Sequence, residues 1–207
     1  MKKYAFILLL AAMQVQSGYA QQKINRDSVL KIMNKVAKWQ LNTWHTVGMN
    51  HKSWDWTNGA CYAGFVALGK MSSDPAYLNE MYGIGSSLNW NTGPNRLKAD
   101  DYCVGQMFSQ MEIIKKDPKM IAKFKVLADS IVAMPHTESL EWKNNVANRE
   151  WAWCDALFMG PPALAYLSTA TGNKKYLETA IKLWFKTTDY LFDKDENLYF
   201  RDSCFFI

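Results

Sequence analysis

The chain has 207 residues, enough for one ordinary domain, and its 49% of apolar residues can form a hydrophobic core. The net charge of +5 is mild, and the lysines between Lys115 and Lys125 have the spacing of a solvated helix face, so nucleic-acid binding is not favoured. Aromatic residues make up 14%, which suits both packing and stacking on sugar rings.

Residues 1–20 have the features of a secretory signal peptide. Two lysines precede an apolar run from Ala5 to Met13, and small residues lead to a cleavage site after Ala20. Loss of these two lysines lowers the net charge from +5 to +3. The run is too short for a membrane span, and no later stretch approaches the roughly 18 apolar residues required. We expect residues 21–207 to be a single exported domain, periplasmic or extracellular.

The cysteines and histidines lie far apart and show no metal-ligand or redox spacing, so the pattern predicts no metal site. Export would permit disulfides, but small and apolar neighbours favour free, buried thiols. These residues are Cys61, Cys103, Cys154 and Cys204, with His45, His51 and His136.

Helical periodicity and start signals predict a succession of helices with a short strand at the end. The predicted helices cover residues 27–46, 59–71, 76–88, 101–114, 118–133, 155–170 and 176–191, and the strand lies within 193–202.

The helices follow a repeated order of polar-aromatic loop, apolar helix, tight turn and amphipathic helix. The turns at Asp74, Asp117 and Asn173 lie 43 and 56 residues apart, a loose period typical of stacked helical hairpins. Apolar helices must be buried on all sides and amphipathic helices cover them, so the pattern predicts an all-α, α/α toroid. The loops at Trp54, Asp100 and Trp151 precede inner helices, and we expect them to converge on one mouth.

The segment Glu150–Pro162 contains the strongest candidate for chemistry. Asp155 follows Trp151 and Trp153 and precedes an apolar run. Desolvation in such surroundings raises the pKa of a carboxyl group and allows it to donate a proton near neutral pH. An Asp before an apolar run is also typical of a helix N-cap, and the residues alone leave both roles open.

Several motifs resemble those of the unsaturated rhamnogalacturonyl hydrolases, glycoside hydrolase family 105. They cover nearly all of residues 21–207 in the family's order. The motifs are Asp55-Trp56-Thr57-Asn58-Gly59, Ala99-Asp100-Asp101, the run from Trp151 to Leu164, Thr171 to Leu177, and Leu198-Tyr199-Phe200-Arg201-Asp202.

The resemblance implies an (α/α)6 barrel that removes a 4,5-unsaturated galacturonyl residue from rhamnogalacturonan (pectin) oligosaccharides, with no cofactor. It assigns Asp155 as general acid and base. Asp101 matches the family's second carboxylate better than Asp100. Substrate contacts are implied for Trp56, Asn58, Asp100, Trp153 and Met159.

Only about three and a half hairpins are recognisable, so we expect the amino-terminal half of a barrel, inactive by itself. Members of the family continue with an Arg-Gly-Asn-Gly-Trp type motif that this chain lacks. Two alternatives stay open at this point: a non-catalytic carbohydrate-binding protein, and an unsaturated glucuronyl hydrolase that acts on glycosaminoglycan fragments. The oligomeric state is not indicated.

Overall fold

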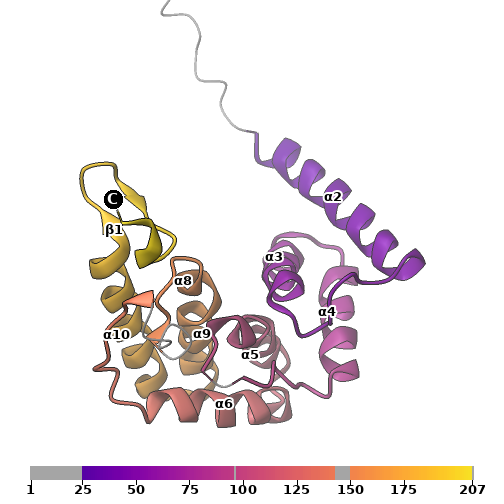
Figure 1. Cartoon of the computed structure of the whole chain (residues 1–207). Helices are drawn as coiled ribbons and strands as arrows, with labels where there is room; N and C mark the ends of the chain where they lie inside the picture. The colour runs from indigo at the N-terminus through magenta and orange to yellow at the C-terminus, as the bar shows by residue number, and fades with distance from the viewer. Residues whose placement is uncertain (1–24, 96, 143–149, 207) are drawn as a thin grey trace, which may run out of the picture. The chain divides into compact units, whose positions relative to one another are not determined.

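The computed structural model describes residues 25–95, 97–142 and 150–206 of the chain. The signal peptide predicted at residues 1–20 lies outside the described residues. The chain divides into two compact units, Met1–Asn42 and Thr43–Ile207. The described part of the first unit is most of one helix, and the second unit contains the helical hairpins (Figure 1).

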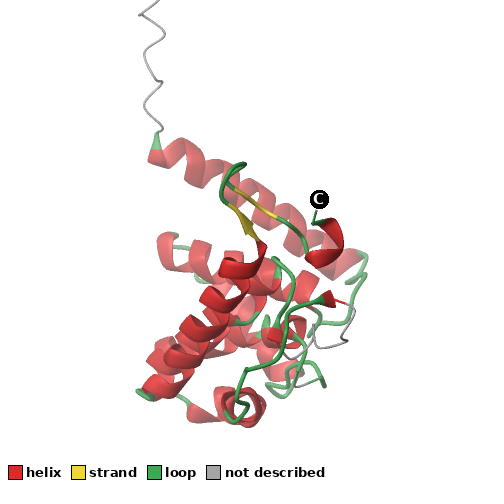
Figure 2. Cartoon of the chain, turned by 60° about the vertical axis from the view of Figure 1, so that its left-hand side comes forward, coloured by secondary structure: helices red, strands yellow, loops and turns green. Residues whose placement is uncertain are grey.

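Helices account for most of the described residues, as the sequence predicted (Figure 2). Their bounds are α2 Arg26–Thr46, α3 Trp56–Met71, α4 Ala76–Ser87, η1 Ala99–Tyr102, α5 Gly105–Lys115, η2 Pro118–Ile121, α6 Ala122–Val132, α8 Ala156–Met159, α9 Pro161–Thr171, α10 Lys174–Leu191 and η4 Ser203–Phe205.

Helix α2 begins one residue earlier than predicted, at Arg26. The side-chain oxygen of Asn25 accepts hydrogen bonds from the N–H groups of Asp27 (2.8 Å) and Ser28 (3.3 Å). Asn25 is therefore the N-cap, and Asp27 lies in the first turn, where a negative charge suits the helix dipole.

The three tight turns between paired helices are confirmed as helix starts. Asp74, Asp117 and Asn173 each accept a hydrogen bond from the N–H group two residues later, at 3.0, 3.1 and 3.2 Å. Before Asn173, Gly172 ends α9 with a φ of +69°, a left-handed conformation that costs glycine little. These capping hydrogen bonds, at the residues that the sequence indicated, mark where the second helix of each hairpin begins.

The apolar helices α3, α5 and α9 contact one another in sequence order, and α4 and α10 pack against the inner helices α3 and α9 (Figure 1). The helix α5 is buried along most of its length, and it carries Met107, Phe108 and Met111 in the core. This is the inner and outer arrangement that the repeat pattern predicts.

Two predicted inner helices are interrupted near their starts. The segment that begins at Ala99 forms the 3-10 turn η1 before α5, and the segment after Asp155 forms the single turn α8 before α9. In the second case Pro161 and Pro162 lack the N–H groups needed to continue α8, so the helix restarts after Gly160. Periodicity does not reveal such breaks.

The carboxyl-terminal segment is a small hairpin and not a single strand. Strand β1 (Phe192–Asp193) pairs antiparallel with β2 (Leu198–Tyr199), with Phe192 opposite Tyr199 (Figure 2). The Asp193 carboxylate accepts N–H groups of the turn at 2.9 and 3.1 Å. None of the helices within the described ranges has the length and hydropathy needed to cross a membrane.

Candidate active site

The three polar-aromatic loops lie close together, as predicted. The Cys103 thiol donates to the Trp56 carbonyl oxygen at 3.7 Å, the Gln106 amide donates to the Phe158 carbonyl oxygen at 2.8 Å, and the Trp151 indole N–H donates to the Leu97 carbonyl oxygen at 3.3 Å. These bonds join the first loop to the second and the second to the third. Side chains from the starts of three inner helices therefore share one region.

Asp155 occupies the N-cap position of α8, but its side chain makes no capping hydrogen bond. The side chain is exposed at the mouth, while the surrounding protein partly desolvates it. This burial raises the pKa of the Asp155 carboxyl, and the negative charge of Asp100 raises it further; Arg201 and a hydrogen bond from Trp153 act in the opposite direction. Because the group is open to solvent, we expect a modest net rise. The carboxyl is accessible to solvent, and it accepts hydrogen bonds from its own backbone N–H and from the Trp153 side chain.

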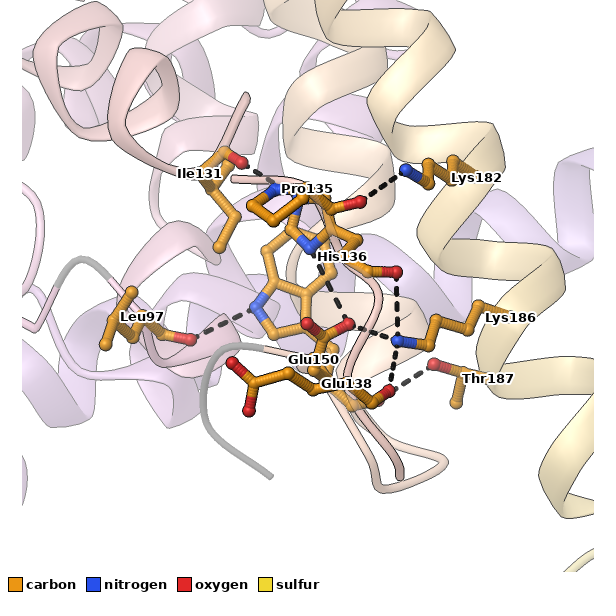
Figure 3. A network of polar contacts seen from close by, with 10 residues as sticks. Leu97, Ile131, Pro135, His136, Glu138, Glu150, Lys182, Lys186 and Thr187 are labelled. Atoms are coloured by element: carbon orange, nitrogen blue, oxygen red, sulfur yellow. Dashed lines mark hydrogen bonds and ion pairs between the residues drawn. The ribbon is translucent and has the colours of Figure 1, made fainter. Parts of the chain in front are cut away.

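The segment before Asp155 is fastened to α10 through a buried ion cluster (Figure 3). Glu150, whose side chain is 1% exposed, forms an ion pair with Lys186. The Lys186 ammonium also donates to the carbonyl oxygens of Glu138 (2.6 Å) and His136 (3.2 Å). The next residue of α10, Thr187, donates its hydroxyl to the Trp151 carbonyl oxygen at 2.9 Å. Two consecutive residues of one helix thus hold the segment that leads to Asp155.

Trp151 connects this cluster to the rest of the mouth. Its backbone has a φ of +55°, which is uncommon for a residue with a side chain, and its ring is buried against Tyr102 at a centroid distance of 5.3 Å. A Cβ atom on Gly160 would lie 2.4 Å from the Trp151 ring. The close approach requires glycine at position 160. The Trp151 ring therefore packs against the backbone that follows Asp155, while the Trp151 backbone precedes it.

Asp100 and Asp101 are neighbours in sequence with different environments. Asp100 pairs with Lys98 at 2.8 Å, and its charge acts on Asp155. Asp101 accepts the backbone N–H of Asn95, and a Cβ atom on Gly93 would lie 2.2 Å from its carboxyl carbon. Burial raises the pKa of Asp101. The charge of Asp100 raises the pKa of Asp155, whereas Asp101 is bonded to its own loop at Asn95. The predicted catalytic role of Asp101 stays a prediction.

The residues predicted to contact substrate have different exposures. Trp56 is 40% exposed at the first turn of α3. Trp153 is buried, edge-on to Trp142 at 6.1 Å. Met159 is buried in α8, and Asn58 is buried and donates to the carbonyl oxygens of His51 and Lys52 at 3.1 and 3.0 Å. Trp56 is the most exposed of these four side chains. The Asn58 amide stabilises the preceding loop through its two hydrogen bonds.

Two residues near Asp155 were not among the predicted site residues. The Cys154 N–H donates to the carbonyl oxygen of Arg201 at 2.8 Å, and the Arg201 guanidinium lies 5.7 Å from the centre of the Trp142 ring. The motif that contains Arg201 was visible in the sequence. The motif did not indicate that the chain after the hairpin returns to Cys154, the residue before Asp155.

The starts of the inner helices thus carry an exposed carboxyl group with a raised pKa, Asp155, a second carboxylate whose charge acts on it, Asp100, and one partly exposed aromatic ring, Trp56. Within residues 25–95, 97–142 and 150–206, no cluster of three or more His, Cys, Asp or Glu side chains has the geometry to hold a metal ion. The four cysteines carry free thiols, of which Cys103 is buried. Burial, followed by the charges of Asp100 and Asp55, raises the pKa of the Cys103 thiol to about 12.

Comparison with known families gives a match over most of the chain. The family model described as Glycosyl Hydrolase Family 88 matches residues 29–206. An unsaturated 3S-rhamnoglycuronyl hydrolase of Formosa agariphila is 29% identical over 216 residues, covering 99% of this chain and 56% of the relative. A protein of the same name from an Alteromonas species is 24% identical over 217 residues, covering 95% and 52%. The chain spans about half the length of the curated relatives it matches.

Solved structures show the same fold. A polysaccharide lyase superposes with a TM-score of 0.71 at 20% identity, covering 87% of this chain and 51% of the other. A glycosyl hydrolase family 88 protein from Bacteroides vulgatus superposes with a TM-score of 0.70 at 19% identity, covering 86% and 52%. Together with the helical hairpins, these similarities confirm the predicted all-α toroid fold.

Proposed function

We propose a function for this chain, which belongs to Glycosyl Hydrolase Family 88: with Asp155 as the general acid and base, it removes an unsaturated uronyl residue from the end of an oligosaccharide by hydrolysis. The observation that carries the proposal is the environment of Asp155. Its carboxyl is exposed at a mouth formed by three loops, it makes no capping bond, and burial and Asp100 raise its pKa. A carboxyl group in this state suits proton transfer at neutral or mildly acidic pH.

The reaction starts from the enol ether of a 4,5-unsaturated uronate. Protonated Asp155 donates its proton to C4, and an oxocarbenium ion forms between C5 and the ring oxygen. Ionised Asp155 then takes a proton from the water molecule that adds to C5, which restores the acid. The resulting hemiketal opens to a ketone, and the hemiacetal left at C1 releases the next sugar. One carboxyl group thus serves as acid and base, so the separation of two carboxylates does not dictate the outcome.

The proposed substrate is an oligosaccharide in which the unsaturated uronyl residue is linked to rhamnose. Both curated relatives are named for a rhamnoglycuronyl substrate, and the motifs suggest a galacturonyl unit from pectin. Elimination makes C4 and C5 trigonal, so galacturonyl and glucuronyl units give the same unsaturated ring. Discrimination against a glycosaminoglycan fragment therefore depends on the linkage and the second sugar.

The decisive assay follows the ultraviolet absorbance of the C4–C5 double bond in an unsaturated galacturonyl-rhamnose disaccharide. It is applied to the 207-residue chain and to a chimera that continues into the carboxyl-terminal part of the Formosa agariphila relative. We expect turnover by the chimera and none by the 207 residues alone. Asp155→Asn should slow the chimera by roughly 10²–10⁴-fold, since that is the usual contribution of a general acid.

The outcomes separate the alternatives. Full activity of Asp155→Asn would refute the assignment of the acid. Binding without turnover by the chimera would favour a carbohydrate-binding function instead, and turnover by the 207 residues alone would overturn the expected inactivity. Export remains part of the proposal and is checked separately, by amino-terminal sequencing of the protein after secretion, which should begin at Gln21.

A further inference from the structure

The turn that follows β2 carries a basic residue, Arg201, close to the start of α8. After β2 the chain returns towards α8, where the Arg201 carbonyl oxygen accepts the Cys154 N–H at 2.8 Å. This main-chain bond places Arg201 beside the residue that precedes Asp155. The charge of Arg201 accordingly acts on the Asp155 carboxyl.

The Arg201 guanidinium is held in place but remains accessible. One of its nitrogens, Nη1, pairs with Asp202 at 2.7 Å; the Asp202 side chain is 1% exposed, whereas that of Arg201 is 61% exposed. The guanidinium also lies over the Trp142 ring, and the Trp142 N–H donates to Ser203 Oγ at 2.8 Å. The buried carboxylate and the ring restrict the orientation of a group that has five N–H donors.

We propose that Arg201 binds the C6 carboxylate of the unsaturated uronyl residue, an inference that rests on the proposed function. The ligand class is a planar carboxylate, which a guanidinium can bind through two parallel hydrogen bonds. The Trp142 ring beneath the guanidinium packs edge-on against the buried Trp153 at 6.1 Å.

The position of Arg201 agrees with the chemistry of the substrate. The carboxylate is attached to C5, and C5 is bonded to C4, the atom that Asp155 protonates. A cation that binds this carboxylate must therefore lie close to the acid, on the side of C5. The Arg201 backbone lies beside Cys154, its charge acts on the Asp155 carboxyl, and the preceding Phe200 N–H donates to the Leu191 carbonyl oxygen at the end of α10. Carboxylate binding would thus orient the double bond towards Asp155.

A purely structural role for Arg201 makes a different prediction. Arg201 neutralises the buried Asp202, whose other oxygen accepts the Cys204 N–H at 2.9 Å. If that were its whole role, replacing Arg201 would weaken the fold and reduce the affinity for every sugar equally. A role in binding requires that the loss depend on the charge of the ligand.

The test compares two ligands and several forms of the full 207-residue chain by calorimetry. The ligands are the unsaturated galacturonyl-rhamnose disaccharide and its uncharged C6 methyl ester. We expect the unaltered chain to prefer the acid by about tenfold, equivalent to ~1.4 kcal/mol. Arg201→Gln should bind both ligands with equal affinity, and Arg201→Lys should keep only part of the preference, since lysine lacks the planar fork.

Two further variants keep the result interpretable. Arg201→Gln combined with Asp202→Asn removes the buried carboxylate that a single change would leave unpaired, and it should also lose the preference for the acid. Lys115→Gln removes one positive charge at the opposite end of α5 and should retain it. A preference that survives in the double variant, or equal binding of acid and ester by the unaltered chain, would overturn the role of Arg201. Failure of the chain to bind either disaccharide would instead contradict the proposed function.

Discussion

Two charged regions flank the same short segment, and they differ in almost every property. At one end, the buried Glu150 carboxylate pairs with Lys186 and faces His136, while Lys186 donates to two backbone carbonyl groups and Thr187 to a third (Figure 3). At the other end, five residues later, Asp155 is exposed and makes no capping bond. The buried cluster fixes the backbone, and the exposed carboxyl stays accessible to solvent. Charges close in sequence can thus serve stability and chemistry separately.

The largest expected effect is on stability, through the buried cluster. Lys186→Met leaves the Glu150 carboxylate buried without its partner, which typically costs about 3–5 kcal/mol of unfolding free energy. Urea denaturation followed by tryptophan fluorescence measures the loss. Lys182→Met, which removes only an exposed bond to the Pro135 carbonyl oxygen, should cost about 0.5 kcal/mol or less.

A double variant checks the cause of that loss. Glu150→Leu combined with Lys186→Met removes both charges, so it should be more stable than Lys186→Met alone. If the double variant is equally unstable, an orphaned carboxylate is not the reason, and the hydrogen bonds of Lys186 to the two carbonyl groups carry the stability instead.

The next effect concerns the ring that links the two regions. Gly160→Ala would place a Cβ atom 2.4 Å from the buried Trp151 ring, and overpacking of this kind costs about 1–3 kcal/mol. Gly64→Ala in α3 is the matched control, because no atom lies within 4 Å of the added Cβ. That change should stabilise the protein by roughly 0.5–1 kcal/mol. Thermal unfolding measures both variants. A higher melting temperature for Gly160→Ala than for Gly64→Ala would contradict the packing argument.

A smaller effect is expected from pH. Burial lowers the pKa of His136 below its ordinary value of 6.5, although Glu150 opposes this. The unfolded chain then binds more protons than the folded chain in the window just below pH 6.5, so stability should fall as the pH decreases through that window. Thermal unfolding between pH 7.5 and 5.5 should show the fall, and His136→Phe should flatten it. A rise in stability on acidification would mean that Glu150 dominates the titration of His136.

The smallest effect on stability is expected at Asp155 itself. Its side chain is exposed and caps no helix, so Asp155→Asn should change the unfolding free energy by no more than about 0.5 kcal/mol. Because burial disfavours the ionised form, a slight gain at neutral pH is the expected sign. A large loss of stability would show that the carboxylate is structural and would remove the contrast with Glu150.

Local patterns in the sequence suggested candidate site residues, and the contacts that depend on distant residues could not be predicted from them. Asp155 was a candidate because aromatic and apolar neighbours surround it in sequence, and the family resemblance assigned its role. Arg201 was not, since its place beside Cys154 depends on a hairpin and on one bond between residues 47 apart in sequence, from 154 to 201. The different roles of Asp100 and Asp101 were equally hidden, because adjacent side chains on a 3-10 turn point in different directions.

The sequence by itself determined the order of the helices and the capped turns between them, and it singled out Asp155 as a candidate acid. These features depend on interactions within a few residues, such as the bond from the N–H of Lys119 to Asp117. The tertiary structure alone decided which charges are buried together and which meet at the mouth. That choice depends on desolvation, and only the packed helices determine which side chains lose contact with water.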